Sequence, residues 1–303
     1  MHFLAIGECM AELAPSSSAG QFSLGYAGDT FNTAWYLRKL CPAGTVSYFT
    51  AVGTDSVSAQ MLGTMADAGI DTRHIVRIPG ASVGLYLIVL KDGERSFSYW
   101  RDTSAARRLA EDETRLATAM EAADVIYFSG ITLAIIGAAG RATLLAALRA
   151  ARAKGKTIAF DPNLRLRLWP GAEEMTAAIM QGAGVSDIVL PSYEDEASFF
   201  KDADTEATAD RYLQAGAKTV VVKNGPAAVH YRHGAEVGAV AIAPVSDVVD
   251  TTAAGDSFNA AFLAGLERGR SLPDCIAVAS QVAGLVIRGK GALVPLDLAG
   301  IAL

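Results

Sequence analysis

Hydrophobic residues along this chain gather in two kinds of segment, short β-type runs and longer segments with helical spacing. The β-type runs predict buried strands at residues 3–7, 46–52, 124–129, 157–160, 187–190 and 219–223. Between them, apolar residues recur at helical spacing in residues 56–68, 108–122, 141–153 and 173–181. Alternation of strands and helices favours an α/β fold in which helices cover both faces of a mainly parallel sheet.

Two segments break this alternation and predict a smaller sheet. Residues 83–90 and 95–100 are β-type runs around Lys91-Asp92-Gly93-Glu94, and an Asp-Gly pair between such runs indicates a hairpin turn. Residues 13–25 lack helical periodicity. Together these segments predict a small antiparallel β lid, from about residues 10–27 and 81–103, inserted into a single domain spanning 1–303. Residues 229–242 predict a further hairpin at the edge of the main sheet.

Composition narrows the class of protein. The 303 residues are 51% hydrophobic and 19% charged, which is typical of a globular protein with a large core. The net charge of −6 gives no basic surface for nucleic acid, and no apolar run is long enough to span a membrane. The start of the chain lacks the features of a signal peptide, and the three widely spaced cysteines fit reduced thiols. We therefore expect a cytoplasmic homo-oligomer that binds small molecules and has neither nucleic acid nor membrane as a partner.

The most informative segment is Asp250-Thr251-Thr252-Ala253-Ala254-Gly255-Asp256. It follows a β-type run at 244–249 and opens an apolar-periodic helix. Small residues at 253–255 allow main-chain N–H groups at the helix start to approach an anion closely. Asp256 lies in the first turn, where a carboxylate can orient and deprotonate a hydroxyl beside a transferring phosphoryl group. The alternative is a capped helix whose acid only interacts with the helix dipole, and that dipole is expected to keep Asp256 ionised.

Polar residues also follow several predicted strands. They include Gly7-Glu8, Ser129-Gly130, the Asp161-Pro162-Asn163-Leu164-Arg165 segment and Lys223-Asn224-Gly225. Since ligands of open α/β sheets bind at the carboxyl ends of strands, these residues predict one shared site. Gly28-Asp29-Thr30-Phe31-Asn32 opens the first long helix, where Asp29 and Asn32 offer groups for sugar hydroxyls. Capping of that helix by Asp29 or Thr30 is the structural alternative.

The lid strands carry aromatic residues and one arginine. Alternation places Tyr86 on the same face as Gly84 and Ile88, and Tyr99 on the same face as Arg101. An aromatic face can stack on a sugar, or it can serve only sheet packing. Arg101 ends a hydrophobic strand and requires an anionic partner, and its planar guanidinium suits a carboxylate. Arg165 is a second candidate of the same kind.

These motifs together resemble those of the ribokinase-like (PfkB-type) carbohydrate kinases, and the resemblance extends across nearly the whole chain. Residues 250–256 resemble the family signature D-T-x-G-A-G-D, with Ala253 in place of the first glycine. Gly28-Asp29-Thr30-x-Asn32, Gly84-Leu85-Tyr86, Tyr99-x-Arg101 and Asp161-x-Asn163-x-Arg165 with Leu168-Trp169 look like the 2-keto-3-deoxygluconate kinase subgroup. The resemblance implies a ribokinase-like three-layer α/β/α fold and ATP-dependent phosphorylation of the terminal hydroxyl of that sugar acid.

The resemblance also implies roles for individual residues. Asp256 would be the base, and the N–H groups of Ala253, Ala254 and Gly255 would stabilise the γ-phosphoryl group together with Mg²⁺. The implied sugar-acid site comprises Gly28, Asp29, Asn32, Tyr86, Tyr99, Arg101, Arg165 and Asp256, and the implied ATP site comprises Asn163, Arg165, Lys223, Gly225 and residues 253–255. Glu194 occupies the acidic position of the family's Asn-x-x-Glu motif, which organises Mg²⁺ through water, although Pro191 replaces the asparagine. Dependence on a monovalent cation stays open.

Two other functions stay open at this stage. One is a kinase for a neutral ketohexose such as fructose, although a neutral sugar needs no pair of arginines. The other is a non-catalytic sugar-acid sensor on the same fold, because a fold does not fix a function. Asp256 argues against the sensor, since binding alone requires no base at that position.

Overall fold

A computed structural model describes residues 1–303 except 17, 19, 92–93, 300 and 302–303. Its central layer is an eight-stranded sheet with the order β14-β13-β12-β11-β10-β9-β1-β4. The strands are β1 (His2–Ile6), β4 (Thr45–Phe49), β9 (Val125–Ser129), β10 (Thr157–Asp161), β11 (Ile188–Val189), β12 (Thr219–Val222), β13 (Val229–His233) and β14 (Glu236–Val240). Neighbours from β4 to β12 pair in parallel, whereas β13 and β14 form an antiparallel hairpin at the edge, as expected.

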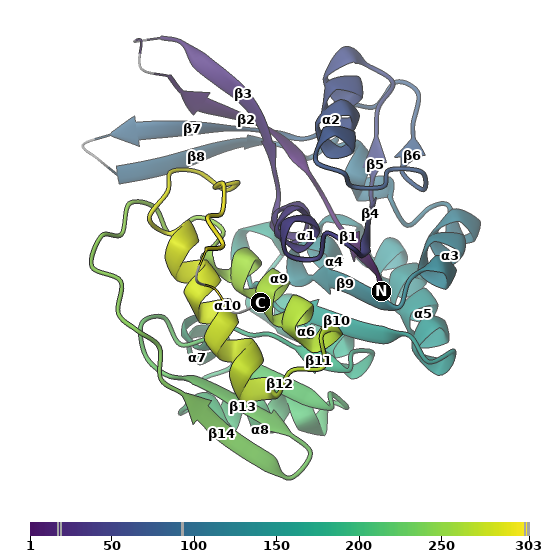
Figure 1. The fold of residues 1–303 in the computed structure, drawn as a ribbon. Coiled ribbons are helices and arrows are strands. Elements are labelled where there is room, and N and C mark those ends of the chain that lie inside the picture. The colour runs from purple at the N-terminus through teal and green to yellow at the C-terminus, as the bar shows by residue number, and fades with distance from the viewer. Residues whose placement is uncertain (17, 19, 92–93, 300, 302–303) are drawn as a thin grey trace.

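Helices cover both faces of this sheet, which gives the expected three layers (Figure 1). On one side lie α1 (Asp29–Leu40), α2 (Ser56–Asp67), α9 (Ala254–Glu267) and α10 (Leu272–Val286). On the other side lie α3 (Glu113–Ala122), α4 (Gly130–Ile135), α5 (Gly137–Ala153), α6 (Ala172–Gly184), α7 (Tyr193–Phe199) and α8 (Thr205–Gln214). Successive strand residues enter opposite cores, as Tyr127 and Phe128 do. Burial on both faces explains why the strand sequences are almost continuously hydrophobic.

The segments expected to form the lid make a second sheet that stands out from the three layers (Figure 1). Its order is β3 (Phe22–Ala27), β2 (Met10–Pro15), β7 (Leu85–Lys91) and β8 (Glu94–Trp100). The two outer pairings are antiparallel, but β2 and β7 are parallel. The expectation of a purely antiparallel lid was therefore wrong for this pair. The turn residues 92–93 lie outside the described residues.

Some element boundaries also differ from the sequence expectation. The strand expected at 46–52 divides into β4 and β5 (Ala51–Val52), and β5 pairs with β6 (Val76–Arg77). The helix expected from residue 108 starts at Glu113, because Asp112 caps it by accepting a hydrogen bond from the Arg115 N–H at 2.9 Å. Short 3₁₀ turns occur at Ala105–Arg108 and Leu166–Leu168.

The strand expected at residues 244–249 does not form. The N–H groups of Val249 and Asp250 donate instead to the carbonyl of Ile287, at the end of α10, over 2.8 and 3.1 Å. Val248 and Val249 are exposed. The lead into α9 is therefore an irregular segment fixed by a helix end rather than by a sheet. Within the described residues, no helix combines the length and apolar character needed to cross a bilayer.

Candidate active site

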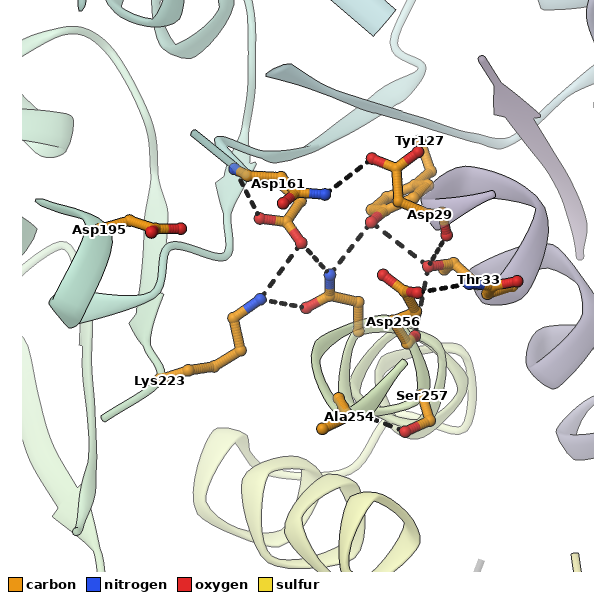
Figure 2. A network of polar contacts seen from close by, with 12 residues as sticks. Asp29, Thr33, Tyr127, Asp161, Asp195, Lys223, Ala254, Asp256 and Ser257 are labelled. Carbon is orange, nitrogen blue, oxygen red and sulfur yellow. Dashed lines mark hydrogen bonds and ion pairs between the residues drawn. The ribbon is translucent and has the colours of Figure 1, made fainter. Parts of the chain in front are cut away.

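Polar residues from four elements meet where the carboxyl ends of the parallel strands face the starts of α1 and α9 (Figure 2). Asp29 and Asn32 come from α1, and Asp256 comes from the first turn of α9. Asp161 ends β10, and Lys223 follows β12. The sequence expectation of one shared site at this edge is consistent with this geometry.

Direct hydrogen bonds connect these residues. The Asn32 side-chain amide donates to Asp256 Oδ2 at 2.8 Å, and the Asn163 amide donates to Asp29 Oδ2 at 2.8 Å. Lys223 Nζ lies 3.3 Å from Asp161 Oδ2. Asn163, expected on the nucleotide side, thus contacts a residue of the expected sugar site and joins the two sides.

The start of α9 has the small-residue geometry that the sequence indicated. Ala253 is the residue before the helix and adopts a left-handed conformation, with φ of 60°. Among the described residues, no side chain caps this helix end. The Ala254 N–H, however, already donates to the Thr251 carbonyl at 3.2 Å, so it is not a free donor as expected. The anion site at this helix end therefore rests on the other early N–H groups.

The protonation state expected for Asp256 was wrong. Burial raises the pKa of its carboxyl from the ordinary 3.8 to about 8, and the nearby carboxylate of Asp29 adds to the effect. The Asn32 amide and the Lys223 ammonium oppose the rise only in part. The helix dipole is too weak to offset burial among other acids. A carboxylate with this pKa is a stronger base than an ordinary aspartate.

On the lid, Tyr86 and Tyr99 lie side by side with ring centroids 5.8 Å apart. The Tyr86 hydroxyl donates to the carboxylate of Glu12. The Tyr99 hydroxyl accepts a hydrogen bond from Arg167 Nη2 at 2.6 Å, and that guanidinium lies 4.1 Å from the Tyr99 ring centroid. Arg167 therefore links the lid to the turn after β10. Sequence reasoning passed over Arg167, although it stands two positions after Arg165.

Arg101 lies in a buried ion pair. Its side chain is 7% exposed and pairs with the buried carboxylate of Glu8. Glu8 also accepts a hydrogen bond from the Ser104 hydroxyl at 2.5 Å. The anion that the sequence required for Arg101 is thus supplied within the protein. Arg101 Nε is buried and has no hydrogen-bond partner among the described residues.

Glu194, the acid expected near the metal, and its neighbour Asp195 point in different directions. Arg165 Nη1 lies 3.2 Å from Asp195 Oδ2, and Asp195 points into the network while Glu194 is exposed (Figure 2). Burial raises the pKa of Asp195, and the charge of Arg165 opposes that rise. The α-helical turn of α7 explains the difference, because adjacent residues of a helix point in different directions.

Two of the expected glycines have backbone roles. A Cβ on Gly28 would lie 2.1 Å from the carbonyl oxygen of Glu8, so only glycine allows α1 to start this close to β1. Gly225 follows Lys223 with φ of 54°, the left-handed conformation that favours glycine. Both positions shape the backbone that carries the neighbouring polar residues.

Known proteins share this sequence pattern and this fold. The family model described as pfkB family carbohydrate kinase matches residues 2–298. The chain belongs to the pfkB family of carbohydrate kinases.

Individual sugar kinases are similar to this chain over nearly its whole length. The chain is 40% identical to a 2-dehydro-3-deoxygluconokinase of Escherichia coli K12 and 38% identical to one of Haemophilus influenzae. The alignments cover 96% of both chains in the first case, and 95% of this chain and 94% of the relative in the second. A fructokinase with bound ATP from Xylella fastidiosa is similar in structure, with a TM-score of 0.84 at 24% identity, over 96% of this chain and 94% of that one.

Proposed function

We propose that this protein is an ATP-dependent kinase of 2-keto-3-deoxygluconate, the compound also written 2-dehydro-3-deoxygluconate. It transfers the γ-phosphoryl group to the terminal hydroxyl and forms 2-keto-3-deoxy-6-phosphogluconate. The observation that carries this proposal is Asp256, held by Asn32 at the uncapped start of α9. The relatives at 38–40% identity support the choice of acceptor.

Each of these groups has a role in the proposed phosphoryl transfer. Asp256, in its ionised form, accepts the proton of the terminal hydroxyl through a carboxylate oxygen. The hydroxyl oxygen forms the new bond to the γ-phosphorus, the bond to the bridging oxygen breaks, and ADP leaves. The early N–H groups of α9 other than that of Ala254, together with the ammonium of Lys223, stabilise charge on the phosphoryl oxygens. Protonated Asp256 cannot accept this proton, so turnover requires its ionised form.

Mg²⁺ fits the chemistry of this site. Among the described residues, no group of three or more acidic, histidine or cysteine side chains is arranged to hold a metal ion. Mg²⁺ in kinases commonly uses one or two carboxylates together with substrate phosphates and water, so no such group is needed. We propose Asp195, through water, as the protein group that organises Mg²⁺, in place of Glu194. When bound, Mg²⁺ would neutralise charge on the phosphates.

We further propose that residues 1–303 form one kinase domain in which 10–27 and 81–103 act as the lid. Tyr86 and Tyr99 would cover the sugar and exclude water, which limits hydrolysis of ATP. Arg101 and Arg165 would bind the carboxylate or the adjacent keto group. Arg167, which already contacts Tyr99, would hold the lid near the turn after β10.

Substrate preference tests the sugar-acid proposal. We expect kcat/KM for 2-keto-3-deoxygluconate to exceed that for fructose by about 100-fold or more, because charge-assisted hydrogen bonds contribute roughly 1.5–3 kcal/mol each. Arg101→Lys should lower kcat/KM for the acid about tenfold, since lysine lacks the planar fork, and should leave fructose nearly unchanged. A coupled assay of ADP release measures both.

The choice of lysine follows from the structure. Arg101→Ala would leave Glu8 buried without a cation, at a cost of roughly 3–5 kcal/mol in folding free energy. Arg108→Lys, at an exposed arginine paired with Glu111, is the matched control. Equal losses on both substrates, or a wild-type preference for fructose, would favour the kinase of a neutral ketohexose instead.

We propose that the chain forms a homo-oligomer through the outer face of the lid. The strand register places Leu13, Leu24 and Leu87 on one face, with Phe22 beside them. Phe22 and Leu24 are 47% and 45% exposed, and Val89 and Trp100 extend the same apolar face. A contiguous apolar face of this kind is typical of a protein–protein interface, and a second copy of the lid is its proposed occupant.

Light scattering coupled to gel filtration tests this assembly. We expect wild-type particles of at least twice the chain mass of 31.6 kDa. Leu24→Glu should shift the mass to that of a single chain, because it buries a charge in the interface. Val237→Glu, at an exposed valine of β14, is the control and should keep the wild-type mass. A monomeric wild type would contradict the proposal.

We propose a cytoplasmic location with no nucleic-acid partner. Cys9, Cys41 and Cys275 are free and buried. Free thiols suit a reducing compartment. The net charge of −6 supports the absence of a nucleic-acid surface.

A further inference from the structure

Asn259 is a buried polar residue that neither the sequence motifs nor the proposed chemistry uses. It lies on α9, one helical turn after Asp256, and its side chain is fully buried. A buried amide without hydrogen bonds would cost folding free energy, so its partners indicate what it does.

Both ends of the Asn259 amide are engaged. Its oxygen accepts a hydrogen bond from Lys223 Nζ at 3.1 Å. Its nitrogen donates to Asp161 Oδ2 at 2.6 Å and to the hydroxyl of Tyr127 at 3.0 Å. An amide serves this position because it accepts from a cation on one side and donates to a carboxylate on the other. Aspartate would place a second carboxylate against Asp161, and leucine would offer neither group.

Lys223 needs such a partner to keep one position. Its side chain has four rotatable bonds, and fixing a lysine side chain costs roughly 1.5–2 kcal/mol of conformational entropy. Its contact with the carboxylate of Asp161, at 3.3 Å, is longer than an ordinary charge-assisted hydrogen bond. Asn259 therefore supplies the shorter of these two contacts and also fixes Asp161.

The held ammonium lies beside the anion site. A Cβ built on Gly255 would be 3.6 Å from Lys223 Nζ, so the ammonium lies against the first turn of α9. Tyr127 fixes the other end of the amide, and the Thr33 hydroxyl lies 3.4 Å from the Tyr127 hydroxyl. The lysine after β12 and the acid on β10 thus meet through one side chain of α9.

We propose that Asn259 is a positioning residue for the nucleotide, acting through Lys223. This inference rests on the proposed function, because it assumes that Lys223 faces the phosphates of ATP. Asn259 touches neither substrate in this scheme. It fixes the position of the Lys223 ammonium, which contacts the phosphates.

A double-mutant cycle on ATP affinity, measured by calorimetry, tests the proposal. Asn259→Leu and Lys223→Met should each weaken ATP binding about tenfold, and the double variant should be no weaker than Lys223→Met alone. KM for the sugar acid should change by less than about twofold. A residue with only a structural role would give additive losses and would raise both KM values. Ser186→Ala removes a buried hydroxyl bonded to the Gly182 carbonyl far from the site and is the control for general destabilisation.

The outcomes separate this inference from the function on which it rests. Additive losses, or unchanged ATP affinity in Asn259→Leu, overturn the role of Asn259. A wild type that fails to bind ATP overturns the proposed function itself. If Asn259→Leu does not fold, the nearly isosteric Asn259→Asp replaces it in the cycle. That variant should also bind ATP about tenfold more weakly, because it sets a carboxylate against Asp161, and wild-type affinity in it contradicts the proposal.

Discussion

Replacing Asp256 by asparagine is expected to lower kcat by about 100-fold or more while the fold and ATP binding persist. Asparagine keeps the size of the side chain and can still contact Asn32, but it cannot accept the proton of the acceptor hydroxyl. Loss of a general base typically costs a factor of about 10² to 10⁴. The measurement is kcat from coupled ADP release, with ATP affinity from calorimetry. Asp274→Asn, at the first turn of α10, is the matched control.

The pH dependence of the same pair of proteins tests the state of Asp256. Its folded pKa of about 8 lies above the ordinary value of 3.8, so the folded protein binds this proton more tightly than the unfolded chain. The contribution of Asp256 to stability is therefore full below about pH 4 and is lost as pH rises to about 8. An asparagine at this position does not titrate and has no such dependence. We expect the melting temperature of the variant to equal that of wild type near pH 4 and to exceed it by roughly 3–8 °C at about pH 9.

The catalytic activity of the wild type should rise with pH, whereas the contribution of Asp256 to stability falls. Because the ionised carboxylate is the base, wild-type kcat/KM should rise with pH up to about 8. Wild-type turnover in a folded Asp256→Asn protein would remove Asp256 from the mechanism. If the difference in melting temperature between wild type and Asp256→Asn stays constant with pH, Asp256 is ionised throughout. That is the state expected from the helix dipole alone.

The sequence was most informative where a pattern is local. Continuous hydrophobic runs predicted the strands because the sheet is buried on both faces, and the signature at 250–256 predicted the start of α9. The strand expected at 244–249 was wrong because hydrophobic character cannot show that Ile287 takes up the N–H groups of Val249 and Asp250. The same limit applies to the parallel pairing of β2 with β7, which depends on how two distant segments leave the main sheet.

The sequence predicted several of the residues that belong to the polar site. It did not predict which of their side chains contact each other. The pairing of Arg101 with Glu8 joins residues 93 positions apart. The sequence named Glu194 but could not show that Asp195 contacts Arg165, because the direction of each side chain depends on the rotation of a short helix. Asn259 was missed for another reason. It stands inside an apolar helix, where only the positions of Lys223 and Asp161 reveal its use.

Gly255→Val is expected to lower kcat/KM for ATP by more than about 100-fold with little change in melting temperature. Among the described atoms, a Cβ at this position would meet only Lys223 Nζ, at an ordinary contact distance of 3.6 Å, so the unliganded fold can accept a side chain. The branched methyl groups of valine would nevertheless occupy the space beside the first turn of α9, where phosphates must approach the backbone.

Gly255→Ala separates this steric effect from backbone strain. Alanine adds the Cβ without the branches, so it should fold like wild type and bind ATP less than about tenfold more weakly. Gly63→Val, on α2 where a Cβ would meet no described atom within 4 Å, is the matched control and should keep full activity. An unchanged KM for ATP together with an unchanged kcat in Gly255→Val would mean that the phosphates bind away from α9. In that event Lys223, whose ammonium lies against the same turn, would lose its proposed role as well.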